Sequence, residues 1–473
     1  MKQYNMIING EAGTASELAD VINPATGQPF AQVAVGTPED VDRAVAAAAE
    51  AFKSWSQTSD AQRQDLIHQL AVRLEDNMPE LMEIVTKESG KPMGGLNGVG
   101  SGMEVGGSMA WLHVTADLEL PVDVIQDDDA ARVEVHRKPL GVVGSITPWN
   151  WPLMIAIWHI APALRAGNTV VIKPSPFTPV ATLRFVELAN SILPPGVLNI
   201  VSGGPKLGAA ITNHPGIAKI VFTGSSVTGK DIMRSAAGNL KRLTLELSGN
   251  DAGIVLDDVD IKAVAPKLVG ACFHNNGQTC AALKRLYVPE SIYEELAQEM
   301  ASIAGQLKVG DGLEEGTDLG PLQNKRQLKI VEELAESARR EGGRFLCGGQ
   351  PLDREGYFFA PTLVADLSNG SRLVDEEPFG PIVPIIKYRD IDEVISLAND
   401  SPSGLGGSVW AKDIDRALEV GKQIESGSLW INDHGAIQPN APFGGIKESG
   451  FGVEFGSYGL EEFTHIQTVK VVK

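Results

Sequence analysis

The chain has 473 residues, too many for one ordinary hydrophobic core, and its length favours roughly two to four domains. Hydrophobic residues make up 43% and charged residues 21%, which is typical of a soluble globular protein and argues against disorder. The net charge of −20, with no run of Lys and Arg, argues against nucleic-acid binding.

The cysteines and the termini predict the compartment. Three cysteines without a CxxC pair indicate a reducing environment and predict neither a disulfide framework nor a metal site. The first ten residues lack a signal-peptide pattern, and the longest apolar stretch, 151–164, is too short to cross a bilayer. We therefore expect a cytoplasmic protein without a membrane partner.

The first part of the chain reads as helices followed by a hairpin. Apolar periodicity predicts amphipathic helices at 39–53, 61–76 and 79–89. Residues 119–138 alternate in polarity around an acidic turn, which predicts two strands of a hairpin that could project from the body.

From residue 139 the pattern alternates between short apolar strands and helices. Such alternation predicts a parallel, doubly wound α/β sheet that binds its ligand at the C-terminal ends of its strands. The expected strands are 141–147, 168–175, 196–203, 219–225 and 242–247, and the expected helices are 152–166, 178–192, 204–213 and 226–237. The alternation restarts at 252–258 and includes a helix at 262–276, predicting a second α/β domain, and the chain ends in a strand-like run at 464–472.

One glycine-rich turn has two interpretations. Gly224 to Lys230 fits the first seven positions of a phosphate-binding P-loop, but Asp231 stands where Ser or Thr would bind magnesium. A nucleoside triphosphatase is therefore disfavoured. What remains is either a helix N-terminus that accepts a phosphate or a tight strand-to-helix turn. No GxGxxG sequence occurs.

Three polar residues near strand ends could be functional or structural. Asn150 could donate to an oxyanion or cap the following helix. Lys173 could bind a ribose or phosphate, or be a surface lysine on a turn. Glu246, at the end of an apolar strand, would have a raised pKa suited to a general base, or else face solvent.

Cys280 stands in FHNNGQTCAAL, directly after Gly277, Gln278 and Thr279. A free cysteine is more often a buried packing residue than a nucleophile, and no His–Asp pattern accompanies this one. As a nucleophile it would need activation by a nearby carboxylate or by backbone dipoles.

Together these motifs resemble the aldehyde dehydrogenase superfamily over essentially the whole chain. The resemblance includes TKESGKP, PWNWP, KPSPFTP, FTGS, LELSG, GQTC, EEPFGP and PFGGIKESGFGVEFGSYGLEEFT, in the family's order. Glu246 and Cys280 lie 34 residues apart, as in the family. The resemblance implies a Rossmann-like cofactor domain at 1–118 and 139–248, a catalytic domain at 249–448, and a β-hairpin oligomerisation arm at 119–138 and 449–473.

The resemblance also implies a mechanism. Cys280 would attack the aldehyde, Asn150 would stabilise the oxyanion, and hydride would pass to the cofactor, leaving a thioester. Glu246 would activate the hydrolytic water, and Glu454 would lie on a proton path to Glu246. The resemblance therefore predicts a hydrolytic, NAD(P)-dependent aldehyde dehydrogenase.

The implied cofactor residues lie in or next to five of these motifs, except Gly208. Lys173 would reach the adenosine ribose, Ser225 and Gly224 would begin the helix that faces the pyrophosphate, and Glu377 would hold the nicotinamide ribose beside Phe379. The full set is Ile146, Thr147, Pro148, Trp149, Lys173, Ser175, Pro176, Gly208, Phe222, Thr223, Gly224, Ser225, Val227, Gly229, Leu247, Glu377 and Phe379.

Two positions depart from the family pattern. Pro176 stands where many NAD-preferring members carry a ribose-binding glutamate, so NADP is a second candidate, although NAD ranks first because KPSPFTP gains no basic residue. Lys284 stands where many members have serine, and the sequence gives no interpretation of it.

The implied substrate tunnel is mostly apolar and aromatic. Its residues would be Trp151, Met154, Trp158, His274, Ile437 and Phe443, although each could equally be a plain core residue. This lining favours an uncharged aliphatic or aromatic aldehyde. The hairpin and the C-terminal strand imply a homodimer or a homotetramer.

Two alternatives remain. In a CoA-acylating aldehyde or semialdehyde dehydrogenase, coenzyme A would resolve the thioester, but acylating relatives usually lack the base at Glu246. A non-catalytic protein on the same scaffold, as some lens crystallins are, would be expected to have lost Cys280 or Glu246.

Overall fold

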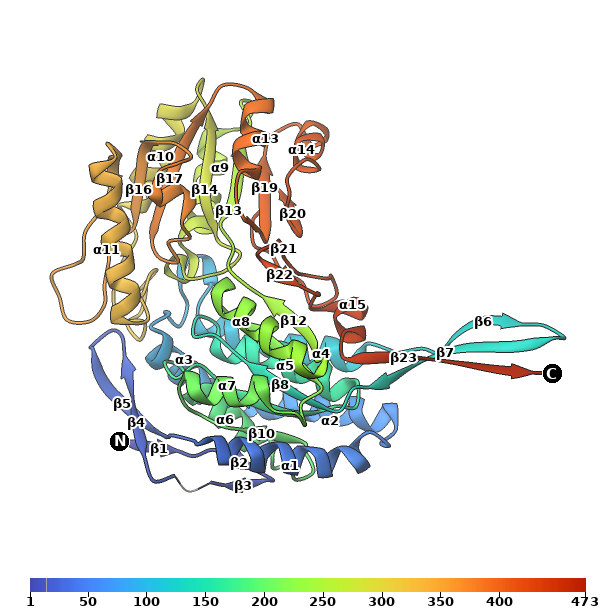
Figure 1. Ribbon diagram of the computed structural model, residues 1–473. Helices are drawn as coiled ribbons and strands as arrows, with labels where there is room; N and C mark the ends of the chain where they lie inside the picture. Colours follow the sequence, from blue (N-terminus) through green and yellow to red (C-terminus); the bar gives the residue numbers. More distant parts are fainter. Residues whose placement is uncertain (14) are drawn as a thin grey trace.

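The computed structural model describes residues 1–13 and 15–473, and two large sheets organise it (Figure 1). The first sheet has the order β22-β12-β11-β8-β9-β10-β2-β3. Its five central strands are parallel and almost entirely buried, because helices cover both of its faces. They are β8 (Val142–Ile146), β9 (Thr169–Lys173), β10 (Leu198–Ile200), β11 (Lys219–Thr223) and β12 (Arg242–Glu246).

Among the five parallel strands, the chain begins in the middle, at β8. It proceeds through β9 and β10 on one side and then returns to add β11 and β12 on the other. The strand order therefore reverses between β8 and β11, where a doubly wound sheet binds its ligand. The connecting helices are α5 (Pro152–Arg165), α6 (Val180–Ala189), α7 (Pro205–Asn213) and α8 (Ser226–Ala236).

Four helices precede the five parallel strands, three of them at predicted places. They are α1 (Pro38–Trp55), α2 (Asp60–Asp76), α3 (Met78–Ser89) and α4 (Ser101–Asp117). α4 packs against α2 and α5 and was not predicted. The remaining N-terminal strands are β1 (Lys2–Tyr4), β2 (Ile7–Ile8), β3 (Glu11–Ala12), β4 (Leu18–Asn23) and β5 (Gln28–Ala34), of which β2 and β3 extend the first sheet.

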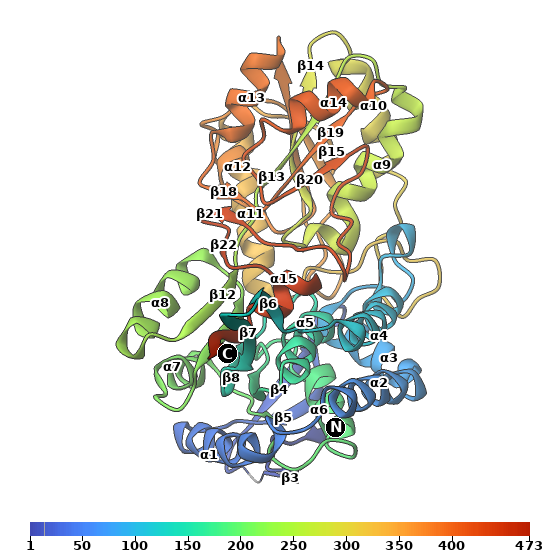
Figure 2. The ribbon, with the colours of Figure 1, turned by 90° about the vertical axis from the view of Figure 1, so that its right-hand side faces the viewer.

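The second sheet has the order β15-β16-β17-β14-β13-β19-β20, and all its neighbours are parallel except β15 and β16. Its strands are β13 (Asp251–Val255), β14 (Leu283–Pro289), β15 (Arg344–Cys347), β16 (Thr362–Leu367), β17 (Ile382–Tyr388), β19 (Gly406–Trp410) and β20 (Ser428–Ile431). Its helices are α9 (Ile261–Phe273), α10 (Tyr293–Ala304), α11 (Lys325–Arg340), α12 (Arg372–Asp375), α13 (Ile391–Asn399) and α14 (Ile414–Gly421). Figure 2 shows this body above the first, with α15 (Gly456–Glu461) between them.

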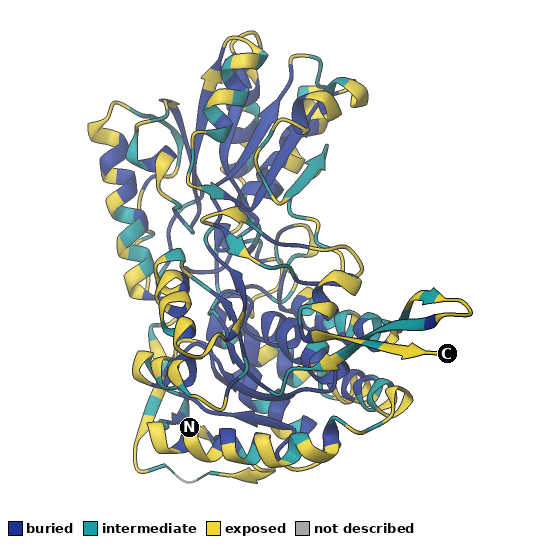
Figure 3. Cartoon of the chain, turned by 45° about the vertical axis from the view of Figure 1, so that its right-hand side comes forward, coloured by how far each residue is buried: buried dark blue, intermediate teal, exposed yellow. Residues whose placement is uncertain are grey.

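A three-stranded antiparallel sheet projects from the first body (Figure 1). It consists of β6 (Asp123–Asp127), β7 (Ala131–Pro139) and β23 (Thr464–Val472), and much of its surface is exposed (Figure 3). The rest of the C-terminal segment lies elsewhere: β22 (Gly450–Phe451) pairs with β12, α15 contacts α5, and β21 (Ile446–Lys447) pairs with β18 (Ser403–Gly404). The predicted assignment of 449–473 to one arm stays a prediction.

Candidate functional site

The loop that carries Cys280 is shaped by residues with left-handed backbone. α9 ends at Phe273 rather than at the predicted residue 276, because Asn275 and Asn276 have φ of 49° and 58°. Asparagine tolerates this conformation better than most residues. Gly277 follows at φ 70°, and a Cβ there would lie 2.3 Å from the carbonyl oxygen of Gly380. The loop therefore packs directly on the turn that follows α12.

Asn150 is joined to this loop and does not cap α5. The N-cap position of α5 is Trp151. The side-chain amide of Asn150 donates to the carbonyl oxygen of Gln278 at 3.0 Å. The backbone carbonyl oxygen of Asn150 accepts hydrogen bonds from Lys91 Nζ at 2.9 Å and from Asn275 Nδ2 at 3.2 Å. These bonds fix the amide group beside the Cys280 loop.

Glu246 is buried at the C-terminal end of β12, so it is not a solvent-facing strand residue. Neither of its carboxylate oxygens has a hydrogen-bond partner among the residues that the structure describes. Burial, followed by the negative charge of Glu454, raises its pKa well above the usual value of 4.5. A carboxylate in this environment has the properties of a general base.

Glu454 belongs to a second group of buried polar side chains. Its backbone pairs with that of Phe443 through bonds of 2.8 and 2.9 Å. Its Oε1 lies 3.3 Å from Nε2 of His159, whose Nδ1 lies 2.8 Å from Oγ of Ser145. Because Glu454 also acts on the pKa of Glu246, the two carboxylates share one buried electrostatic environment.

Cys280 is partly buried, between two cavities that both reach it. Burial raises its pKa to about 12; the positive charge of Lys284 acts in the opposite direction, and Glu246, Asp251 and Glu377 raise the pKa further. The thiol is therefore protonated at neutral pH in the ligand-free protein, and its activation depends on added positive charge or on a base.

A cavity of about 190 Å³ opens on one side of Cys280. It gathers nine predicted residues besides the cysteine: Pro148, Trp149, Asn150, Thr223, Gly224, Ser225, Leu247, Glu377 and Phe379. The rings of Trp149 and Phe379 meet edge to face at 5.3 Å between centroids. Ser248 and Gln327 also line this cavity, and neither was predicted as a site residue.

The helix N-terminus at α8 forms one wall of this cavity. Ser225 is its N-cap and accepts a hydrogen bond from the Thr228 backbone. A Cβ on Gly224 would lie 2.5 Å from the Phe222 ring, and one on Gly229 would lie 2.5 Å from Leu247. At Gly224 and Gly229 the backbone therefore lies too close to a neighbouring side chain for a larger residue to fit. This close packing is compatible with a phosphate site and with a plain strand-to-helix turn.

The residues predicted for the adenosine end lie next to one another. Ile146 and Lys173 are opposite each other in β8 and β9, and a Cβ on Gly208 would lie 3.7 Å from Lys173 Cε. Lys173 is buried rather than on the surface, and burial lowers its pKa to about 8. The remaining predicted residues here are Thr147 and Ser175, which are buried, and Pro176 and Val227, which are exposed.

A second cavity of about 320 Å³ opens on the other side of Cys280. It gathers Trp151, Met154, Trp158, His274 and Ile437 from the predicted tunnel. Phe443 does not line it and instead packs near Phe455, with ring centroids 6.1 Å apart. The walls that the sequence analysis missed include Val99, Met103, Trp111 and His434.

His274 is a neutral member of this lining. Its Nδ1 lies 3.1 Å from the carbonyl oxygen of Gly270, so Nδ1 carries the proton and donates. Burial lowers the pKa of His274 to about 4. No Lys or Arg is among the residues that line the cavity. The cavity therefore offers no cation to a charged substrate.

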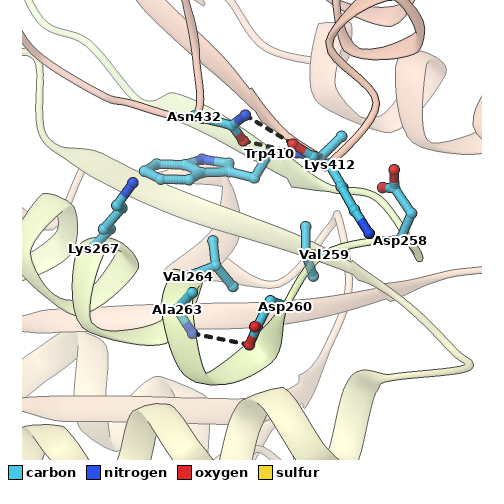
Figure 4. A pocket seen from close by; sticks show the side chains of 10 residues that line it. Asp258, Val259, Asp260, Ala263, Val264, Lys267, Trp410, Lys412 and Asn432 are labelled. Atoms are coloured by element: carbon cyan, nitrogen blue, oxygen red, sulfur yellow. Dashed lines mark hydrogen bonds between the residues drawn. The ribbon is translucent and has the colours of Figure 1, made fainter.

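A further cavity of about 520 Å³ lies away from these residues, at the C-terminal ends of β13 and β19 (Figure 4). Its lining includes Asp258, Lys267, Trp410, Lys412 and Asn432, none of which was predicted as a site residue. Within the described residues, no group of three His, Cys, Asp or Glu side chains could hold a metal ion, and no helix is long and apolar enough to cross a bilayer.

A thiol between two cavities, one at the switch point of a doubly wound sheet and one apolar, defines a cofactor-dependent enzyme class with a cysteine at its centre. The family model "Aldehyde dehydrogenase family" matches residues 11–469, and the chain belongs to this family. Membership confirms the predicted family, the α/β fold class and the assignment as an aldehyde dehydrogenase.

Several relatives cover nearly the whole chain. The phenylacetaldehyde dehydrogenase of Pseudomonas fluorescens is 39% identical over 99% of this chain and 96% of its own. The chloroplastic betaine aldehyde dehydrogenase of Beta vulgaris is also 39% identical, over 95% and 92%. Among solved structures, the NAD+ complex of the Bacillus cereus aldehyde dehydrogenase has a TM-score of 0.96 at 36% identity and covers 100% of this chain and 97% of that one.

Proposed function

We propose that the protein oxidises an uncharged aliphatic or aromatic aldehyde to a carboxylic acid through a thioester on Cys280 that water hydrolyses. The observation that carries this proposal is the place of Cys280, which lines both the cavity at the switch point and the apolar cavity. Asn150 and Glu246 supply the two further groups that this chemistry needs.

Cys280, Asn150 and Glu246 would each carry out a different step of this reaction. The Cys280 thiolate attacks the aldehyde carbon to form a C–S bond, and the Asn150 amide together with the Cys280 backbone N–H stabilises the oxyanion. When bound, NAD(P)+ would supply the acceptor for the substrate hydride, and Cys280 would keep its C–S bond to the substrate carbon, which is then at the thioester level. Glu246 takes a proton from water, which attacks the thioester; the C–S bond breaks, and the carboxylate leaves.

The cofactor is NAD(P), as predicted, and the residues present fit it. Glu377 and Phe379 would hold the nicotinamide half, Gly224 and Ser225 the pyrophosphate, and Lys173 the adenosine ribose. We expect NAD to be the preferred cofactor, because KPSPFTP offers no extra cation for a 2′-phosphate. Pro176 stands in place of an acid that would repel this phosphate, so NADP is the alternative cofactor. For the other residues of the predicted cofactor set, we likewise propose contact with NAD(P).

The lining of the second cavity supports the substrate class. Its walls are mainly aromatic and aliphatic, and His274 stays neutral at physiological pH because its pKa is about 4. A carboxylated or phosphorylated aldehyde would find no cation there. Relatives of equal identity are named for phenylacetaldehyde and betaine aldehyde, so identity alone does not select one aldehyde.

The arm supports assembly of identical subunits. β23 forms its edge, and the apolar side chains of Ile466, Val471 and Val472 are exposed along it. A strand edge of this kind pairs readily with another chain. We propose a homodimer or a homotetramer in the cytoplasm, with catalytic domain 249–448 and a cofactor domain formed by 1–118 and 139–248.

A substrate panel tests the function directly. The full-length protein is mixed with propanal, benzaldehyde and succinic semialdehyde, each with NAD and with NADP, and absorbance at the reduced-nicotinamide band is followed. We expect oxidation of the two uncharged aldehydes and release of free acid. Turnover only with coenzyme A would favour the acylating alternative, and an inert protein would favour the non-catalytic one.

A further inference from the structure

Lys284 is a buried cation near the catalytic thiol. It lies at the start of β14, and its side chain is only 2% exposed. Its Nζ lies 2.9 Å from Oε1 of Glu377 and also donates to the carbonyl oxygen of Cys280. The same nitrogen is 5.8 Å from the centroid of the Phe379 ring.

These contacts join two segments that are distant in sequence. The carbonyl oxygen of Cys280 belongs to the thiol loop, while Glu377 and Phe379 belong to the turn between α12 and β17. Both partners line the cavity at the switch point of the first sheet. A displacement of Lys284 would therefore disturb the cysteine loop and the turn at the same time.

The charges around the site make this lysine hard to replace. Burial raises the pKa of Glu377, Lys284 lowers it, and Asp251 raises it. Glu246, Asp251 and Glu377 act unfavourably on ionisation of Cys280, whereas the positive charge of Lys284 favours it and is the largest charge effect on this thiol. Removing a buried partner leaves its counterpart unpaired in a medium of low polarity, which is costly.

We propose that Lys284 is a positioning residue that ties the carboxylate of Glu377 to the loop bearing Cys280, so that cofactor affinity and thiol reactivity depend on one buried cation. The inference rests on the proposed function, which assigns Glu377 to the nicotinamide ribose. Lys284 lowers the pKa of Glu377 and holds its carboxylate in place for the ribose hydroxyls, and it gives the Cys280 thiolate a compensating charge.

The test compares Lys284→Met with the wild-type full-length protein. We expect the Kd for NAD+, measured by calorimetry at pH 7.5, to rise roughly tenfold, since the ribose contact would lose a charged acceptor. The rate of iodoacetamide modification at Cys280, followed by peptide mass mapping without cofactor, should fall by roughly tenfold at a given pH, equivalent to about one unit in thiol pKa. Lys329→Met, which removes an exposed lysine on α11, serves as the control and should change neither quantity.

A double-mutant cycle separates positioning from general damage. In the Glu377→Gln background, Lys284→Met should cost little further NAD+ affinity, because the two residues act together. An equal loss in both backgrounds, or a Kd and a modification profile like those of the wild type, would overturn the inference. If Lys284→Met does not fold, Lys284→Gln keeps a donor without the charge and carries the same expectations.

Failure of the inference differs from failure of the proposed function. If the wild-type protein oxidises aldehydes with NAD(P) and the Lys284→Met variant keeps its Kd and thiol profile, only the proposed role of Lys284 is refuted. If the wild-type protein binds neither NAD+ nor NADP, the proposed function itself is refuted.

Discussion

Replacing Lys91 by methionine should destabilise the protein far more than the same change four residues earlier. Lys91 is fully buried, pairs with Glu104 and donates to the Asn150 carbonyl oxygen. Its Nζ also lies 3.3 Å from the centroid of the Trp151 ring. Glu104 in turn accepts from the backbone N–H groups of Leu153 and Met154 at the start of α5.

The expected magnitude follows from this burial. Breaking a buried pair by removing one partner costs about 3–5 kcal/mol, because the remaining charge is left uncompensated. Lys87 pairs with Glu83 on the surface, with side chains 32% and 54% exposed, and such pairs contribute about 0–1 kcal/mol. Methionine retains most of the lysine stem, so the comparison isolates the charge.

Differential scanning calorimetry of both variants measures the effect. At roughly 2 °C per kcal/mol for a large domain, we expect the Tm of Lys91→Met to fall by ~6–10 °C and that of Lys87→Met by ~2 °C or less. Lys91→Met should also lower kcat, since the carbonyl that it holds belongs to Asn150. Equal shifts in the two variants would refute the claim that Lys91 supports the site from a buried position.

Two further predictions concern the proposed chemistry. Because the pKa of Glu246 is raised by burial, its base form is present above that pKa, and deacylation should slow as pH falls through it; Glu246→Gln should remove this dependence and leave a hydride burst followed by a stalled steady state. Stopped-flow absorbance measures both, and an unchanged steady state at neutral pH would count against Glu246 as the base. Pro176→Glu should lower the NADP/NAD ratio of kcat/KM by roughly tenfold, because a carboxylate would bind ribose hydroxyls and repel a 2′-phosphate. A higher ratio would show that position 176 does not face the ribose.

The alternating core of the fold was predictable because its strands are short, apolar and separated by helices. The predicted strands around β8, β9, β11 and β12 all occur, since residues buried on both faces of a sheet must be apolar. α4 was not predicted, because Gly102, Gly106 and Gly107 weaken its helical pattern. Its helical state depends on packing against α2 and α5.

Cys280, Asn150 and Gly224 were singled out because they stand in or next to motifs that carry the family resemblance. Taken alone, each of these segments also allowed a structural interpretation, and the roles proposed for them stay predictions. The tunnel walls Val99, Met103 and Trp111 were missed because their arrival beside Cys280 depends on how α4 and its preceding loop pack. Lys284 likewise gains meaning only from Glu377, which is distant in sequence.

The central claim is that the substrate carbon becomes bonded to Cys280 and is released by Glu246. The most direct measurement mixes Glu246→Gln with benzaldehyde and NAD+, quenches in acid, and maps the peptides by mass spectrometry. The account predicts an added benzoyl group on Cys280, assigned by fragment-ion masses, with none on Cys272 or Cys347 and none in a Cys280→Ala version of the same variant. Reduced cofactor formed at the burst with no acyl group on Cys280 would contradict it.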